Sequence, residues 1–304
     1  MGKTAFMFPG QGAQYVGMGK DFYDEFDYVK DIYNIASKAS ELDVEKLCFE
    51  ENEELNITEF TQVALLTTEV AILEAVLKTG VKPDYCLGLS LGEYGALAAA
   101  EVLSCEDLFK VIRKRGLYMQ QEYPTGGAMA AVLGSDYETI KAVCDSTEGI
   151  VTVANDNCPG QIVISGEEEA VNKAMEALMA AGVKRCIPLK VSGPFHSELL
   201  KGAGEKLSKV LEDVAINDPQ IPYVSNVTAK LVKDKSDIKD LLTRQVYNGV
   251  RFRESILELV ENGVTTFVEI GPGKTLSNFV KKIDKQLTVI NIEKVADLEK
   301  LQSM

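Results

Sequence analysis

One serine lies between two glycines in the arrangement of a nucleophile elbow. The segment Gly88-Leu-Ser-Leu-Gly92 reads G-x-S-x-G, with a short apolar run before it and a small-residue helical pattern after it. In a strand–turn–helix context the two glycines permit a sharp turn that exposes the hydroxyl of Ser90. The N-terminus of the following helix would favour negative charge that develops nearby. The pattern therefore predicts acyl-transfer chemistry at Ser90, and its alternative is a tight turn with a helix-capping serine.

A serine nucleophile needs a base, and the chain offers one histidine. His196 lies in an expected loop before a helix and follows Ser90 in the chain, as in α/β-hydrolase triads. No acidic partner is obvious, because Asp156 follows a strand of a separate expected unit, so a backbone carbonyl could orient the ring instead. The alternative is a surface histidine. A base with the unperturbed pKa of about 6.5 predicts that acylation falls below roughly pH 6–7. A single histidine also excludes a His-rich metal site.

Two glycine-rich stretches resemble nucleotide-binding motifs, and both are incomplete. Gly10-Gln-Gly-Ala-Gln-Tyr15 has tyrosine where the third small residue of G-x-G-x-x-G belongs. Gly271-Pro-Gly-Lys-Thr275 ends like a Walker A motif, but Val268 stands where its first glycine is required. Both stretches therefore predict strand-to-helix turns, and the first could bring a backbone N–H close to an oxyanion.

Arg115 lies in a predicted helix that is rich in lysine and arginine. Taken alone, such a pattern indicates a solvated helix face.

Short apolar segments alternate with helical patterns along the chain, which predicts an α/β fold with a mostly parallel sheet. The expected strands are residues 4–8, 85–89, 222–226, 266–270 and 288–292. The expected helices are residues 21–39, 61–78, 91–100, 105–122, 198–213, 236–248, 252–262 and 274–283.

The middle of the chain follows a different order, βαββαβ, which is that of a ferredoxin-like unit. Its expected strands are 128–133, 150–154, 161–165 and 184–188, and its helices are 137–145 and 167–181. Turn-like sequences at 124–127 and at Ser192-Gly-Pro194 bound it. We therefore predict a core made of residues 1–125 and 193–304, with residues 126–192 inserted as a small subdomain.

Charge and composition exclude several kinds of partner. The chain has 304 residues, with 32 Lys and Arg against 46 Asp and Glu, and a net charge of −14. Such acidity argues against binding to nucleic acid and to anionic membranes. No apolar run is recognised as a membrane span or signal peptide, and the six cysteines form no C-x-x-C pair. We expect a cytoplasmic monomer with reduced thiols and neither nucleic-acid nor membrane partners.

Nine short stretches resemble, in the same order, those of malonyl-CoA:acyl-carrier-protein transacylases. They are Phe8-Pro-Gly-Gln-Gly-Ala-Gln14, Thr61-Gln-Val-Ala-Leu65, Gly88-Leu-Ser-Leu-Gly-Glu-Tyr94, Arg115-Gly116 with Met119-Gln120, Gly127-Ala-Met-Ala-Ala131, Asn155-Asp-Asn-Cys-Pro-Gly-Gln161, Pro194-Phe-His196, Gln245-Val-Tyr-Asn248 and Glu269-Ile-Gly-Pro-Gly-Lys274. The resemblance implies an α/β-hydrolase-like core with a ferredoxin-like insertion, in agreement with the pattern of elements.

The resemblance also implies catalytic roles. Ser90 would be the nucleophile that carries the malonyl group, and His196 its general base and acid, held by a backbone carbonyl. The backbone N–H groups of Gln11 and Leu91 would form the oxyanion hole. Arg115 would bind the malonyl carboxylate, because a guanidinium can grip a carboxylate through two parallel hydrogen bonds.

Other pocket residues follow from the same resemblance. Gln245 and Gln62 would line the pocket, and Phe195 matches the malonyl-selective pattern of related polyketide acyltransferases. One position departs from the family, which often has histidine where Leu89 stands. That histidine is not the catalytic one, so the departure affects the pocket wall.

The implied activity is transfer of malonyl from malonyl-CoA to the phosphopantetheine thiol of acyl carrier protein for fatty-acid synthesis. No metal and no cofactor of the enzyme's own is implied, because malonyl-CoA is a substrate and the carrier brings the phosphopantetheine. The alternatives are a polyketide-pathway acyltransferase, an editing hydrolase of the same fold, or a non-enzymatic module that binds carrier protein.

Docking of an acidic carrier protein on this acidic chain would require a local basic patch. We favour Lys184, Arg185 and Lys190, because a pantetheine arm entering between the subdomains would pass near them. The other basic clusters are Lys110/Arg113/Lys114 and Lys281/Lys282.

Overall fold

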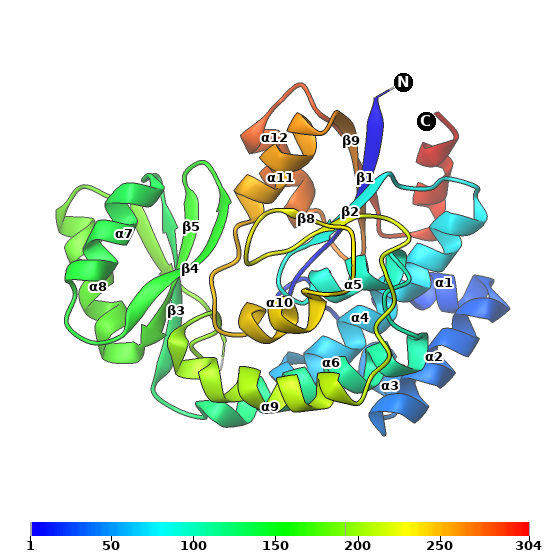
Figure 1. The fold of residues 1–304 in the computed structure, drawn as a ribbon, viewed down its shortest axis with the longest axis horizontal. Helices are drawn as coiled ribbons and strands as arrows, with labels where there is room; N and C mark the ends of the chain where they lie inside the picture. The colour runs from blue at the N-terminus through cyan, green and yellow to red at the C-terminus, as the bar shows by residue number, and fades with distance from the viewer. Residues whose placement is uncertain (1, 192, 304) are drawn as a thin grey trace.

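The computed structural model describes residues 2–191 and 193–303 and contains two β-sheets with helices packed around them (Figure 1). Residues 1, 192 and 304, which bound the predicted units, lie outside the described residues. The α/β class with a mostly parallel main sheet is confirmed.

The larger sheet has the strand order β10-β9-β1-β2-β7-β8. All its pairings are parallel except that of β7 with β8. Phe8 pairs with Gly88, so β1 and β2 end side by side and the loops that follow them lie next to each other. The strands are β1 (Lys3–Phe8), β2 (Tyr85–Gly88), β7 (Tyr223–Val224), β8 (Leu231–Val232), β9 (Val264–Ile270) and β10 (Thr288–Ile292).

Helices cover both faces of this sheet, which explains why its strands are mostly apolar. Phe6 and Phe8 of β1 pack into one apolar cluster, whereas Ala5 and Met7 pack into another. The first cluster includes residues of α2 (Asp27–Ser40), α4 (Thr58–Lys78), α5 (Gly92–Ala99), α6 (Cys105–Glu122), α9 (Lys201–Glu212) and α10 (Ile238–Gln245). The second includes residues of α11 (Phe252–Glu261) and α12 (Thr275–Ile283).

Several predicted boundaries were wrong. The helix expected over 21–39 is interrupted at Phe26, whose extended backbone (φ −125°, ψ 117°) separates α1 (Lys20–Glu25) from α2. The strand expected over 150–154 continues to Cys158, so Asp156 lies within it. Elements that the sequence analysis missed are α3 (Val44–Phe49), β8 and two 3₁₀ segments, Glu54–Asn56 and Val295–Ser303; the helix expected over 198–213 begins with a 3₁₀ turn, Glu198–Leu200. They are too short or too irregular to give a clear period.

The expectation that no segment has the length and apolarity of a membrane span was wrong for helix α4. Its 21 residues meet both criteria. It lies in the core, with 78% of its most apolar window buried, as the central helix of a globular domain does.

The smaller sheet, at the left of Figure 1, has the strand order β4-β5-β3-β6 and is antiparallel throughout. With its two helices it forms a separate apolar cluster, in the βαββαβ order that the sequence predicts. Its elements are β3 (Gly127–Leu133), α7 (Tyr137–Ser146), β4 (Val151–Cys158), β5 (Gln161–Glu167), α8 (Glu168–Ala180) and β6 (Arg185–Pro188).

Strand β4 fastens the small sheet to the rest of the molecule. The backbone N–H of Asp156 donates to the carbonyl of Val250 at 2.9 Å, and that of Val250 donates to the carbonyl of Ala154 at 2.8 Å. Arg253 on α11 also forms an ion pair of 2.9 Å with the buried carboxylate of Asp156. These contacts fix the side chains of β4 relative to the large sheet.

Candidate active site

Ser90 lies at the tight turn between β2 and α5, with the left-handed φ of 55°. A Cβ atom on Gly88 would come within 1.9 Å of the Gly92 backbone, and one on Gly92 within 2.1 Å of the Phe8 carbonyl. Only glycine fits at these two positions. The N–H of Ser90 donates a hydrogen bond to Oδ1 of Asn226 at 2.7 Å. Asn226 lies just beyond the end of the neighbouring strand β7, so this bond holds the turn in place.

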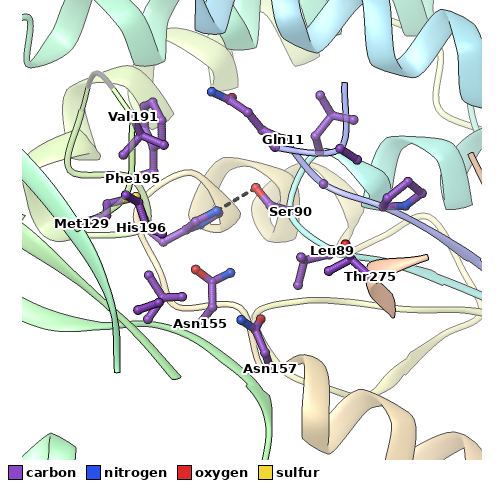
Figure 2. A pocket seen from close by; sticks show the side chains of 18 of the residues that line it. Gln11, Leu89, Ser90, Met129, Asn155, Asn157, Val191, Phe195, His196 and Thr275 are labelled. Atoms are coloured by element: carbon purple, nitrogen blue, oxygen red, sulfur yellow. Dashed lines mark hydrogen bonds between the residues drawn. The ribbon is translucent and has the colours of Figure 1, made fainter. Parts of the chain in front are cut away.

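The hydroxyl of Ser90 faces the imidazole of His196 (Figure 2), and Oγ lies 2.7 Å from Nε2. The other ring nitrogen, Nδ1, lies 2.9 Å from the carbonyl oxygen of Gln245 and 3.1 Å from that of Asn248. Both carbonyls can only accept, so Nδ1 carries the proton and Nε2 presents a lone pair to the hydroxyl. Backbone carbonyls thus occupy the place of a triad acid, while Asp156 is paired with Arg253.

Burial keeps this imidazole neutral. His196 is 3% exposed, and its pKa is lowered to about 4, chiefly by desolvation and then by the positive charge of Arg115. The hydrogen bonds to the two carbonyls act in the opposite direction. The pH below which acylation is expected to fall is therefore lower than the pH 6–7 expected from the unperturbed pKa.

Arg115 is 1% exposed, so the interpretation of its helix pattern as a solvated face was wrong. Its Nη1 donates to Oε1 of Gln62 at 2.7 Å, and its Nη2 donates to Oε1 of Gln245 at 2.9 Å. Nη2 also lies 3.2 Å from Oγ of Ser90, and Nε has no partner among the described residues. Within that part of the chain Arg115 forms no ion pair. A buried cation held by neutral amides beside a reactive hydroxyl is suited to an anionic ligand.

These groups open onto a cavity of about 290 Å³ between the two sheets. Apolar side chains such as Leu89, Met129 and Phe195 form part of its wall, and amides project from β4 (Figure 2). Of the residues expected at the site, Gln11, Gln62, Ser90, Leu91, Arg115, Phe195 and His196 line the cavity. Gln245 does not line it and lies fully buried behind Ser90 and Arg115.

Gln11 and Leu91 follow β1 and β2, whose ends are adjacent. The side-chain amide of Gln11 donates to Oγ1 of Thr58 at 3.1 Å, which fixes the first loop. Neither backbone N–H has an acceptor among the residues described. Two free donors beside Ser90 are the arrangement that an oxyanion hole requires.

Sequence reasoning assigned no role to four polar residues near the site. Asn155 and Asn157 line the cavity, whereas Glu93 and Asn226 are buried behind Ser90. A signal existed for Asn226, a polar residue at the carboxyl end of a predicted strand, where binding residues of parallel sheets gather.

Comparison with known proteins agrees with this geometry. The family model of the acyl transferase domain matches residues 5–302. A malonyl CoA-acyl carrier protein transacylase of Bacillus subtilis is 49% identical over 98% of this chain and 96% of its own length. The chain belongs to the malonyl-CoA–acyl carrier protein transacylase family.

Solved structures of the transacylase family share the whole fold. The Clostridium perfringens malonyl CoA-acyl carrier protein transacylase is 47% identical, covers 99% of this chain and 96% of its own, and has a TM-score of 0.95. A malonyl-transacylase solved in complex with its type II polyketide acyl-carrier protein is 39% identical, with a TM-score of 0.96. That alignment covers 99% of this chain and 100% of the other.

We predict that His196 titrates near pH 4 in the free protein, because burial and Arg115 both disfavour the imidazolium. As the chain has one histidine, NMR of the ring C–H signals can follow it without assignment. Arg115→Gln should raise the midpoint towards the ordinary value of about 6.5, since it removes a nearby positive charge. A midpoint near 6.5 in the unmodified protein would contradict the burial argument.

Proposed function

We propose that the protein transfers the malonyl group from malonyl-CoA to the phosphopantetheine thiol of acyl carrier protein, through an ester on Ser90. The observation that carries the proposal is the buried guanidinium of Arg115, which forms no ion pair with any carboxylate of the described residues and lies 3.2 Å from the Ser90 hydroxyl. Relatives at 43% and 49% identity are named malonyl CoA-acyl carrier protein transacylases, which supports it.

In the first half-reaction, Oγ of Ser90 attacks the thioester carbonyl while Nε2 of His196 takes the hydroxyl proton. The N–H groups of Gln11 and Leu91 donate hydrogen bonds to the carbonyl oxygen as it becomes negative. The tetrahedral intermediate then breaks its C–S bond, and His196 returns the proton to the leaving CoA sulfur. The products are the malonyl ester of Ser90 and free CoA.

The second half-reaction reverses these steps with a different thiol. The carrier's phosphopantetheine sulfur gives its proton to His196 and attacks the ester carbonyl. The C–O bond breaks, and His196 protonates Oγ of Ser90. One thioester replaces another, so the overall free-energy change is small and the reaction needs no cofactor of the enzyme's own.

Arg115 would select malonyl and assist the base. A malonyl carboxylate can accept hydrogen bonds from the guanidinium, whereas an acetyl group offers nothing to this buried charge. The bound carboxylate also offsets the positive charge that lowers the pKa of His196. The imidazolium therefore becomes easier to form when the correct acyl group is present.

A polyketide-pathway role is the second candidate, since one close structural relative was solved with a polyketide carrier protein. The Ser90–His196–Arg115 geometry serves either pathway, because the chemistry is the same and only the carrier differs. The paired Ser90 and His196 favour an enzyme over a binding module. We also propose that the protein acts as a cytoplasmic monomer, which the location of all these site residues on one chain and its six free cysteines support.

We predict that brief mixing with malonyl-CoA leaves one malonyl group on the peptide that contains Ser90. Ser90→Ala should lose both the adduct and the transfer activity, because no other hydroxyl faces His196 Nε2 among the described residues. Peptide mass spectrometry measures the adduct, with acetyl- and methylmalonyl-CoA run in parallel. Labelling at another residue, or an active Ser90→Ala, would refute the mechanism.

We predict that Arg115→Ala loses malonyl transfer by roughly 30- to several-thousand-fold, because removing one member of a buried charged pair costs ~2–5 kcal/mol. Acetyl transfer should rise relative to malonyl transfer. Arg115→Lys should be nearly as poor, since an ammonium cannot reproduce the bidentate geometry. Competition between malonyl- and acetyl-CoA measures the preference, and an unchanged ratio in Arg115→Ala would contradict the assignment.

One residue of the favoured basic cluster lies next to the cavity wall. Lys190 is exposed between Leu189 and Val191, both of which line the cavity. Within residues 2–191 and 193–303, none of Lys184, Arg185 and Lys190 forms an ion pair with a carboxylate. Their charges are therefore available to an acidic partner.

We predict that reversing the charges of Lys184, Arg185 and Lys190 raises the KM for carrier protein and weakens its salt dependence. Hydrolysis of malonyl-CoA, which needs no carrier, should be unchanged and serves as the control. Lys281 and Lys282 provide the comparison, because Nζ of Lys282 donates a hydrogen bond to Oε1 of Gln161, a residue of the cavity wall, at 3.1 Å. An effect confined to those two lysines would place the carrier on the other side of the cleft.

A further inference from the structure

Glu93 is a fully buried carboxylate that the proposed reaction does not use. It lies in the first turn of α5, three residues after Ser90, and does not line the cavity. Its Oε2 accepts hydrogen bonds from Nε2 of Gln245 at 2.7 Å and from the N–H of Asn226 at 3.2 Å. Its Oε1 has no partner in the part of the chain that the structure describes. A buried carboxylate is costly, so its contacts point to a specific purpose.

The two residues that Glu93 holds are those that hold the candidate site. Gln245 donates from Nε2 to the carbonyl of Ser90 at 2.7 Å and accepts from Arg115 through Oε1. Its backbone carbonyl accepts from Nδ1 of His196. Asn226 accepts from the N–H of Ser90 and donates to the carbonyl of Gly88 at 2.7 Å.

The carboxylate and the carbonyl of Ser90 together determine which way the Gln245 amide points. An ionised carboxylate can only accept, and so can the carbonyl of Ser90, so the NH₂ group must face both. The amide oxygen is then directed at Arg115. The reverse orientation would set oxygen against oxygen at Glu93 and N–H against N–H at Arg115.

Glu93 also interacts electrostatically with the buried cation. Burial raises the pKa of Glu93 to about 7, while the Gln245 and Asn226 hydrogen bonds and the charge of Arg115 oppose that rise. The other titratable groups that interact with it are Tyr94 and Tyr223, whose pKa values burial raises as well. Near neutral pH, then, the group that changes charge behind Arg115 is Glu93.

We propose that Glu93 is a positioning residue for malonyl recognition, which orients the Gln245 amide towards Arg115 and balances the charge of Arg115 until a malonyl carboxylate does so. This inference rests on the proposed function. It implies that two carboxylates compete for one guanidinium. Malonyl binding then weakens as Glu93 ionises, so the KM for malonyl-CoA rises with pH.

Two substitutions separate orientation from charge. Glu93→Gln keeps an oxygen for Gln245 and Asn226 and removes the charge, whereas Glu93→Leu removes both. A matched control is Glu69→Gln on α4, since Glu69 is equally buried and neither of its oxygens has a partner among the described residues. Thermal melting checks that each variant folds.

The experiment measures kcat and KM for malonyl-CoA between about pH 6 and 9. We expect the KM of the wild-type protein and of Glu69→Gln to rise several-fold above about pH 7, and that of Glu93→Gln to stay low and flat, with kcat near wild type. Glu93→Leu, if folded, should lose kcat by at least ~10-fold because Gln245 and the Asn226 N–H lose a shared acceptor and are held less firmly. A wild-type pH profile in Glu93→Gln would overturn the proposal, and so would a wild-type kcat in folded Glu93→Leu.

Mass spectrometry of the Ser90 peptide distinguishes this failure from failure of the proposed function. If the wild-type protein forms no malonyl adduct, the proposed function fails. If it forms the adduct and Glu93→Gln keeps the wild-type profile, only the role of Glu93 is refuted.

Discussion

A positive charge taken out of water organises this site. The guanidinium of Arg115 is held by the amide oxygens of Gln62 and Gln245, and lies 5.4 Å from the ring centre of Tyr94. None of these three neutralises it. The imidazole of His196 remains uncharged nearby chiefly because it is itself buried, and the charge of Arg115 disfavours a second cation further. This one charge affects the pKa of His196, the affinity of the site for an anion and the pKa of the neighbouring Glu93 carboxylate.

Two residues near that charge have unusual backbone conformations. Ser90 and His196 have φ values of 55° and 60°, in the left-handed region that residues other than glycine rarely adopt. Such conformations cost about 1–3 kcal/mol each and persist where surrounding contacts enforce them. Here the enforcing contacts are amide and carbonyl hydrogen bonds from Asn226, Gln245 and Asn248. The hydroxyl and imidazole are therefore in place before substrate arrives, which reduces the reorganisation that the reaction requires.

Much of the fold was predictable from the sequence, because it depends on local patterns. The strands β1, β2 and β9 are short apolar runs, and the βαββαβ order identifies the second sheet. The proximity of Ser90 and His196 followed from the elbow motif and from the presence of one histidine. Burial could not be predicted in the same way. Arg115 lies in a lysine-rich stretch whose period suits a surface, and only the packing of α6 against α4 and α9 encloses it.

Properties that arise only when the fold buries a side chain could not be predicted from the sequence either. The lowered pKa of His196 depends on desolvation, which no spacing of residues reveals. Gln245 matched a family motif, but its position behind the cavity wall depends on contacts with Ser90 and Glu93 from another part of the chain. The break at Phe26 and the short β8 depend on tertiary packing in a similar way. Local sequence thus predicts elements better than it predicts what those elements enclose.

The order of the strands has a consequence for how the protein is made on the ribosome. Strand β1 pairs with β9, from residues 264–270, so the central sheet cannot be completed until nearly the whole chain has emerged. The inserted unit separates Ser90 from His196, so a nascent chain carries the hydroxyl long before it carries the imidazole. Pairing between distant segments is also slow. A chain that ends before residue 196 therefore lacks the imidazole that faces Ser90 in the complete molecule.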